Sequence, residues 1–349
     1  MMQIIEIHKG YKPLSLLKGQ LICYSRGQLW ILKNSQFKPL MKLHTSDWKD
    51  CTRLTSRFFR REPKLAVVTL DNRLLVASQK KLLLVDTENE QTRVIASSRE
   101  GFSDPLNICT NCMPWLAVWG DYGSNPKGTE INVYGLKQNL TVEILYTYPS
   151  RTIRHIHNIV PRLHGGYYIL TGDLEATSGI YIADSTFCRV EGFKLGNQQY
   201  RAVVAFDTKN GLLYATDSVN EPNHIYLLQE DGDLLTVGTL NGSCIYGTAI
   251  SSDYFFSTTV EPDESKHGIM SWISNKRGKG ILSNQVTLVK VDSALKAKEV
   301  LRLDKDRLPM KLMQYGSIQF PFGLSEEIWI YPTAVKKYDG ATIRLEARS

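Results

Sequence analysis

Two histidines and one aspartate are the residues of this chain whose types and spacing best suit chemistry. His155 and His157 lie in the run Arg154-His155-Ile156-His157-Asn158-Ile159, and Asp173 closes the next apolar run. Because the two histidines are separated by one residue, they share one face of an extended strand. Imidazole and carboxylate side chains act as general bases and acids, so this hairpin predicts a binding or catalytic site.

Two later segments repeat this hairpin at intervals of about 45 residues, again with polar residues at the strand ends. In each repeat a polar residue opens the first strand, and an acidic residue follows the second. The polar residues of these two repeats are, in chain order, Tyr200, Arg201, Asp217, Glu221, Tyr246 and Glu261.

The elements that must position these residues are short strands. Apolar or alternating runs bounded by Gly, Asn, Asp and Pro fill the chain, which is the pattern of an all-β protein. Modules of four strands, spaced about 40 to 60 residues apart, are typical of propeller blades. We therefore expect a single β-propeller domain over residues 1–349 with about seven four-stranded blades; a pair of β-sandwiches is the competing fold. The modules are expected to begin near Gln20, Leu65, Leu106, Ile153, Arg201, Ile245 and Leu312.

The final module lacks one strand. The segment from Ser317 to Leu345 supplies three strands, and the alternating segment from Gln3 to Ile7 could supply the fourth. A propeller avoids open sheet edges by closing radially, so we expect this N-terminal strand to close the ring.

Antiparallel geometry brings the polar residues to one face, because the start of a first strand and the end of a second strand lie at the same end of a blade. A cleft with converging His, Asp, Glu, Arg and Tyr side chains is what a binding or catalytic site requires. The catalytic candidates are His155, His157, Asp173, Asp217 and Glu261. The substrate-binding candidates are Asp121, Tyr122, Asn125, Tyr200, Arg201, Glu221 and Tyr246.

Structural roles compete with these assignments. Asp121, Asp173 and Asp217 stand at strand ends, where aspartate also stabilises turns. Arg201 needs an acidic partner, and an ion pair between blades explains it as well as anion recognition does.

Composition and charge exclude several classes of protein. The chain is 42% hydrophobic and 22% charged, with a net charge of +7, but it has no motif for nucleic-acid binding. No stretch approaches the roughly 20 apolar residues that span a bilayer, and the N-terminus lacks a secretion signal, so a cytoplasmic location is expected. No cofactor is predicted; a metal ion held by His155, His157 and one aspartate is a lesser alternative. The oligomeric state stays open.

Three stretches carry a resemblance to a known family. They are Gly120-Asp121-Tyr122-Gly123-Ser124-Asn125-Pro126-Lys127, the run from Thr152 to Asn158 with Thr171-Gly172-Asp173, and Gln198 to Val203 with Ala215 to Asn223. Together they resemble bacterial sialidase-like or BNR-repeat-like β-propellers. The chain lacks the Ser-x-Asp-x-Gly-x-x-Trp repeat of true sialidases. The resemblance therefore implies a glycan-related protein of a surface polysaccharide pathway.

Two classes of function follow. The first is a carbohydrate-active propeller that binds and processes an acidic glycan by hydrolysis or β-elimination, with a histidine or carboxylate as base and Arg201 neutralising an acidic sugar. The second is a noncatalytic propeller that binds glycans or proteins. Two partly buried carboxylates about 5 to 10 Å apart would favour a glycosidase. A large exposed apolar patch would favour a protein-binding scaffold.

Overall fold

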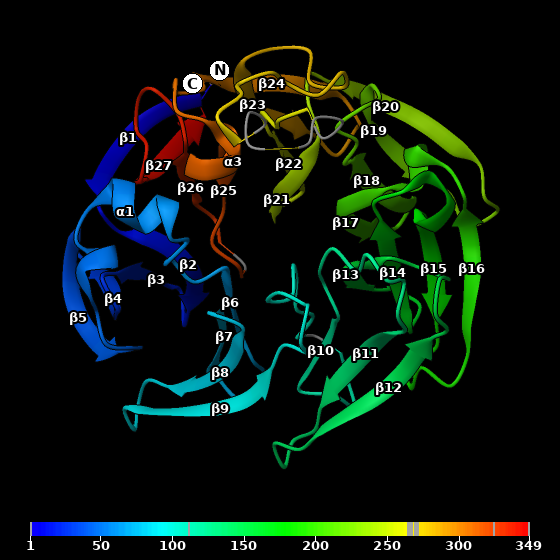
Figure 1. Cartoon of the computed structure of the whole chain (residues 1–349), viewed down its shortest axis with the longest axis horizontal. Coiled ribbons are helices and arrows are strands. Elements are labelled where there is room, and N and C mark those ends of the chain that lie inside the picture. The colour runs from blue at the N-terminus through cyan, green and yellow to red at the C-terminus, as the bar shows by residue number, and fades with distance from the viewer. Residues whose placement is uncertain (1, 111, 264–267, 269–271, 324, 348–349) are drawn as a thin grey trace. The chain divides into compact units, whose positions relative to one another are not determined.

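The computed structural model describes residues 2–110, 112–263, 268, 272–323 and 325–347 (Figure 1). These residues form seven antiparallel sheets, six with four strands and one with three. Each sheet is a meander of consecutive strands except the last, which also takes up the N-terminal strand. The predicted all-β fold, a β-propeller of seven blades, is thereby confirmed.

Two compact units divide the chain. Unit 1 comprises Met1–Glu62, Asp217–His224 and Val237–Ser349, and unit 2 comprises Pro63–Thr216 and Ile225–Thr236.

The described residues of unit 1 form three complete sheets and three short helices. The first sheet consists of β2 (Lys12–Leu17), β3 (Gln20–Ser25), β4 (Gln28–Lys33) and β5 (Gln36–Lys42). The second consists of β21 (Cys244–Ile250), β22 (Asp253–Thr258), β23 (Gln285–Val291) and β24 (Ala297–Asp304). The third consists, in spatial order, of β1 (Met2–Lys9), β27 (Ala341–Ala347), β26 (Ile328–Thr333) and β25 (Ser317–Gln319). The three helices are η1 (Trp48–Asp50), α1 (Arg53–Phe58) and α3 (Met310–Met313).

Unit 2 contains three further sheets and two 3₁₀ turns. Its strands are β6 (Leu65–Val68), β7 (Leu74–Ser78), β8 (Lys81–Asp86) and β9 (Gln91–Ser97); β10 (Ala117–Gly120), β11 (Ile131–Leu136) and β12 (Val142–Tyr148); and β13 (His155–Pro161), β14 (Tyr167–Gly172), β15 (Gly179–Ala183) and β16 (Val190–Leu195). Its 3₁₀ turns are η2 (Glu175–Thr177) and η3 (Gln198–Tyr200). The remaining sheet consists of β17 (Ala202–Thr208), β18 (Gly211–Thr216), β19 (Asn223–Leu228) and β20 (Leu234–Leu240).

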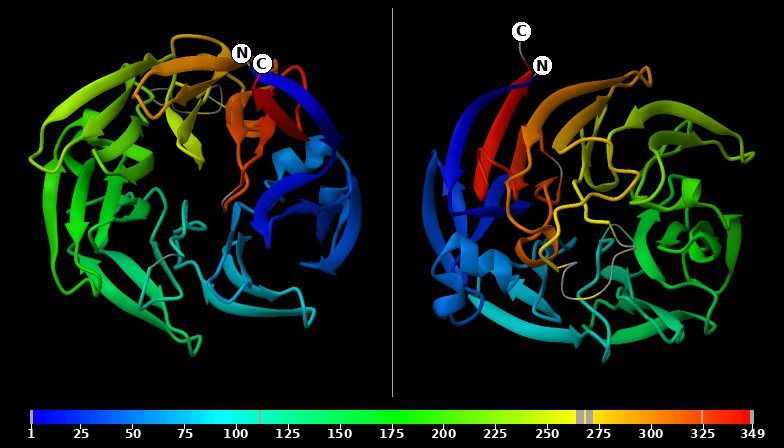
Figure 2. Two further views of the ribbon diagram at one scale, coloured as in Figure 1. Left: turned by 180° about the vertical axis from the view of Figure 1, so that it is seen from behind. Right: turned by 45° about the horizontal axis from the view of Figure 1, so that its top comes forward.

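The N-terminal strand pairs with the C-terminal strand, as the sequence predicts. β1 runs antiparallel to β27, from Met2 opposite Ala347 to Lys9 opposite Ala341. Both views of Figure 2 show the two strands side by side. β1 thus supplies the fourth strand of the sheet that β25, β26 and β27 leave incomplete.

Two expected module starts differ from the structure. The first blade begins at Lys12 rather than Gln20, because β2 contains Pro13 and so lacks the usual pattern of a strand. The third sheet begins at Ala117 rather than Leu106. The segment before Ala117 is irregular and contributes an isolated bridge between Cys109 and Val118.

A bulge recurs in the first strand of four blades. In β2, β13, β17 and β21 the pairing with the second strand skips one residue near the strand start. A bulge adds one residue and redirects its side chain. The skipped residues are Leu14, His157, Val203 and Ile245. Three of these side chains are aliphatic, so the histidine of β13 departs from the pattern of the fold.

Both faces of β14 are buried, and they hold the hairpin of the histidines in place. Tyr167 and Ile169 pack into one apolar cluster, and Tyr168 and Leu170 into another. Burying one such side chain stabilises a fold by about 1.5–3 kcal/mol. The end of β14, which leads to Asp173, is therefore firmly anchored.

Candidate functional site

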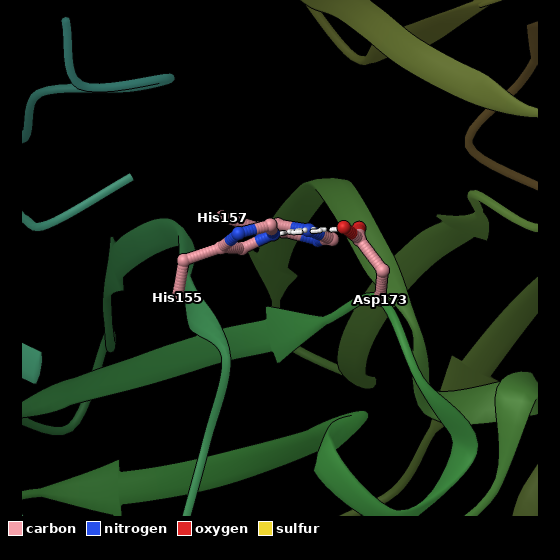
Figure 3. Close-up of side chains that lie close together, drawn as sticks. All are labelled: His155, His157 and Asp173. Atoms are coloured by element: carbon pink, nitrogen blue, oxygen red, sulfur yellow. Dashed lines mark hydrogen bonds and ion pairs between the residues drawn. The ribbon is translucent and has the colours of Figure 1, made fainter. Parts of the chain in front are cut away.

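His155, His157 and Asp173 lie together in unit 2. His155 and His157 come from the start of β13, and Asp173 follows the end of β14 (Figure 3). Residue 155 pairs with Gly172 across the two strands, which brings the carboxylate beside both imidazoles. Both histidines are buried, whereas the Asp173 side chain keeps 26% of its surface exposed. The group is therefore open to solvent on the aspartate side.

Backbone carbonyls fix the orientation of both imidazole rings. Nδ1 of His155 lies 2.5 Å from the carbonyl oxygen of Gly123, and Nδ1 of His157 lies 2.9 Å from that of Ala202. A carbonyl oxygen only accepts hydrogen bonds, so both Nδ1 atoms carry the hydrogen. In the neutral rings, both Nε2 atoms therefore carry a lone pair.

These two lone pairs face each other and a carboxylate oxygen. The two Nε2 atoms are 2.9 Å apart. Oδ1 of Asp173 lies 3.3 Å from Nε2 of His155 and 3.2 Å from Nε2 of His157. Three electron-rich atoms at these distances repel one another unless a proton or another cation lies among them. The arrangement is thus a site for a positively charged species.

Arg201 binds the same aspartate at two atoms. Its Nη2 lies 3.1 Å from Oδ1 of Asp173, and its Nη1 donates a hydrogen bond of 3.0 Å to the Asp173 carbonyl oxygen. The Arg201 side chain is only 9% exposed. Asp173 is therefore an acidic partner of Arg201, which the sequence predicted to need one.

Burial and neighbouring charges shift the pKa values of His157 and Asp173. Burial lowers the pKa of His157 to about 4. For Asp173, burial favours the neutral acid, but the two imidazoles, which donate hydrogen bonds to the carboxylate only when they carry a proton at Nε2, and the charge of Arg201 outweigh it and lower the pKa. Asp173 is therefore an anion at neutral pH.

An outer layer of side chains holds this group. Arg154 donates a hydrogen bond of 2.7 Å to the Ser124 carbonyl, and its Nε lies 3.8 Å from Oδ2 of Asp173. Gln198 donates a hydrogen bond of 3.0 Å to the Asp173 carbonyl, and Asn107 donates one of 3.1 Å to the His157 carbonyl. None of these three residues was predicted from the sequence as part of the site. Arg154 directly precedes His155, and Gln198 lies two residues before Tyr200. Their positions next to predicted site residues could therefore have identified these two as part of the site.

Tyr122 links the group to a partly buried lysine. Its ring centroid lies 4.7 Å from that of His155, and the Lys64 ammonium lies 3.9 Å from the Tyr122 centroid. Lys64 also donates a hydrogen bond of 2.9 Å to the Asp104 carbonyl. Burial lowers the pKa of Lys64 to about 7. Lys64 was not predicted from the sequence, because it precedes an ordinary apolar strand.

Two further predicted residues of unit 2 hold loops together. Asp121 accepts hydrogen bonds from the Asn132 backbone and the Tyr134 hydroxyl, and it pairs with Arg99 at 2.7 Å. Asn125 donates hydrogen bonds to the carbonyls of Thr129 and Arg154. Asn125 therefore positions the start of β13.

Tyr200, also in unit 2, is partly buried against an apolar cluster. Four predicted site residues belong to unit 1. Asp217 is buried and Glu221 is exposed. Glu261 accepts hydrogen bonds from the hydroxyls of Ser243 and Thr259, and burial raises the pKa of Tyr246 to about 12. The site residues that the structure brings together are thus His155, His157, Asp173 and Arg201, with Tyr122 beside them.

Comparisons with known proteins establish the fold. No protein-family model matches the chain, and no curated protein matches its sequence. Among solved structures, the WD40 β-propeller domain of Doa1 matches all of this chain and 98% of its own, with a TM-score of 0.59 at 10% identity. An oligogalacturonate lyase from Vibrio parahaemolyticus matches 98% of this chain and 90% of its own, with a TM-score of 0.56 at 10% identity. The CNH domain of AfRom2 matches all of this chain and 99% of its own, with a TM-score of 0.54 at 8% identity.

The chain therefore has the seven-bladed β-propeller fold. At identities of about 10%, this likeness extends to the fold alone, because propellers of one shape serve unrelated functions. No sequence match supports the sialidase-like family that the motifs resemble. In the part of the chain that the structure describes, no helix is long and apolar enough to cross a membrane.

Proposed function

We propose that the group of His155, His157, Asp173 and Arg201, called here the histidine site, binds and processes an acidic carbohydrate. The observation that carries this proposal is the convergence of two imidazole Nε2 atoms and one carboxylate oxygen within 3.3 Å. Such a set of groups, buried on one side and open on the other, is typical of functional sites.

The side chains of the histidine site favour β-elimination over hydrolysis. Glycoside hydrolysis uses two carboxylates on opposite sides of the bond to be broken, about 5 to 10 Å apart. Of the four residues of the histidine site, Asp173 alone is a carboxylate. Elimination from a uronate instead needs a base for the proton beside the carboxylate group and positive charge to stabilise the resulting anion. Imidazole supplies a base, and arginine supplies the charge.

Arg154 is the residue best placed to meet the substrate carboxylate. Arg201 is buried and committed to Asp173, whereas 29% of the Arg154 side chain is exposed. A partly exposed guanidinium beside a buried site suits recognition of an anionic sugar. One structural relative is named an oligogalacturonate lyase, and oligogalacturonate is a chain of uronates. Oligogalacturonate is therefore the first substrate to test.

The test is an assay of the purified chain on acidic and neutral oligosaccharides. Elimination from a uronate forms an unsaturated product that absorbs ultraviolet light, whereas hydrolysis forms only new reducing ends. We expect the absorbing product from oligogalacturonate or another uronate oligomer and none from neutral oligomers. Arg154→Ala should lower activity or affinity at least tenfold, whereas Arg189→Ala, which removes an exposed arginine, should change neither. Absence of both binding and turnover across the uronate panel would refute the proposal.

A second candidate function rests on a different surface. In unit 1, η1 and α1 expose Trp48, Leu54, Phe58 and Phe59. The ring of Phe59 contacts those of Trp48 and Phe58 at centroid distances of 5.1 and 5.0 Å. Exposed aromatic clusters of this kind mark protein-binding surfaces. Site-specific photocrosslinking from position 58 in cells, followed by binding of the purified partner to the Trp48→Ser variant, tests this alternative. Unchanged affinity of that variant would exclude this surface.

A further inference from the structure

We propose that His155, His157 and Asp173 bind one divalent transition-metal ion. The inference deepens the proposed function, because it concerns the same side chains, but its test measures metal and does not require a carbohydrate. On sequence grounds a metal ion is the lesser alternative, but the geometry of the donors points to the metal.

The donor set is the first argument. Each of the three residues offers one ligand atom, and these atoms all lie within 4.8 Å of one another. Both histidines present Nε2 with its lone pair, since Nδ1 donates to a carbonyl in each ring. Two imidazoles and one carboxylate are ligands that zinc, manganese and iron(II) share in proteins. Calcium and magnesium prefer oxygen ligands alone, so they fit this set poorly.

The distances are the second argument. An ion about 2.0–2.1 Å from two ligands at angles between a right angle and the tetrahedral angle holds them about 2.8–3.4 Å apart. The three separations are 2.9, 3.2 and 3.3 Å. All three ligands therefore fit one ion that lies to one side of their plane.

The partners of the ligands are the third argument. Metal-bound histidines donate their second N–H to a carbonyl or carboxylate, which fixes the ring and its tautomer. His155 does so to Gly123, and His157 does so to Ala202. Ligand carboxylates are likewise held by hydrogen bonds, and Arg201 holds Asp173 at both Oδ1 and the backbone carbonyl. Every ligand thus has the support that metal ligands receive.

An ion held by these three ligands would keep coordination positions for a substrate. Three protein ligands on one side of an ion leave its remaining positions open, as in catalytic zinc sites and facial-triad iron sites. The open side here corresponds to the partly exposed Asp173 carboxylate, near the Arg154 guanidinium. An ion in this position would attract the carboxylate of a uronate and stabilise the charge that develops during elimination. Because it would occupy both Nε2 lone pairs, the base would then be a water molecule on the ion in place of an imidazole.

A shared proton is the competing explanation for the close approach of the two Nε2 atoms. A proton between the rings satisfies one pair of atoms, whereas an ion satisfies all three. Metal titration separates the two explanations, because a site that holds only a proton takes up no metal.

The experiment uses the full chain, stripped with a chelator and then titrated separately with Zn²⁺, Mn²⁺ and Co²⁺. We expect one ion per chain by elemental analysis after gel filtration, a raised melting temperature, and a visible spectrum of bound Co²⁺ with nitrogen and oxygen ligands. His155→Ala, His157→Ala and Asp173→Asn should each weaken binding by about 100-fold or more. His164→Ala, which removes an exposed histidine outside the site, should bind like the wild type.

Two controls distinguish loss of metal binding from loss of folding. Circular dichroism establishes that each variant is folded, and the stripped wild type supplies the same test without any substitution. A folded wild type that binds none of the three ions at micromolar concentrations overturns the metal proposal, as does binding that survives all three substitutions. Metal binding without activity on uronates would leave the metal site standing and refute the proposed function, whereas activity in a stripped protein that takes up no metal would do the reverse.

Discussion

Gly172 lies directly against the imidazole of His157. A β-carbon at residue 172 would lie 2.9 Å from Nε2 of that ring and closer still to Cε1. The same glycine pairs with His155 across the two strands. The absence of a side chain at Gly172 therefore leaves the space that the His157 ring occupies beside His155.

We predict that Gly172→Ala disrupts the histidine site without unfolding the protein. The new methyl group must displace the His157 ring, which costs about 1–3 kcal/mol in a packed interior. Metal affinity and activity on uronates should fall at least tenfold. Both are measured beside the free energy of unfolding in denaturant.

Gly165→Ala is the matched control for this variant. Gly165 lies in a turn with φ of +90° and open space around it, so alanine there adds backbone strain without touching the site. It should lower stability by about 1 kcal/mol and leave metal binding unchanged. Equal metal affinity in Gly172→Ala and Gly165→Ala would show that metal binding does not depend on the position of the His157 ring.

We predict different effects for the two arginines beside Asp173. Arg201 is buried and bound to that residue twice, so Arg201→Ala should destabilise the fold by about 3 kcal/mol. Arg154 is more exposed and 3.8 Å from the carboxylate, so Arg154→Ala should cost less than 1 kcal/mol. Melting curves and uronate binding are measured on both. A stable Arg201→Ala variant that has lost only ligand binding would make Arg201 the recognition residue instead.

Lys64 should make stability depend on pH in the alkaline range. Burial lowers its pKa from 10.5 to about 7. Between these values the unfolded chain binds a proton that the folded protein does not, so stability rises as pH increases from about 7 to 10.5. We expect Lys64 to contribute a gain in stability across this window, measured by urea unfolding at several pH values as the difference between the wild type and a variant without this lysine.

Lys64→Met isolates this contribution. Burial also lowers the pKa of Lys12 and Lys305, so some rise with pH remains in the variant. The rise should nevertheless be clearly smaller than in the wild type. Identical slopes for the two proteins would mean that Lys64 keeps its charge, held by the Tyr122 ring and the Asp104 carbonyl.

Removal of the N-terminal strand should destabilise unit 1. Deletion of residues 1–10 removes the partner of β27 and leaves its backbone groups unpaired at an open edge. We expect a lower melting temperature and concentration-dependent aggregation, measured by light scattering. Addition of a synthetic peptide of residues 1–10 should partly restore both. An unchanged melting temperature would show that the pairing adds little to stability.

The sequence by itself determined the class of the fold and part of the site. Repeated strand hairpins predicted the seven blades, and the incomplete final module predicted the pairing of β1 with β27. These inferences succeed because a period of two residues and turn-forming residues are local signals. The choice of His155, His157 and Asp173 as candidates also came from local sequence, since polar residues at strand ends are unusual where neighbouring positions are apolar.

Only the tertiary structure decided what these residues can do. The bulge between β13 and β14 redirects His157. The carbonyls of Gly123 and Ala202 that orient the rings, and the pairing of Arg201 with Asp173, join residues 28 to 45 positions apart. No local pattern encodes which nitrogen of an imidazole faces a carbonyl, because that depends on backbone from a neighbouring blade. The sequence therefore indicated which residues could do chemistry, and the packing of one blade against the next determined that their lone pairs converge.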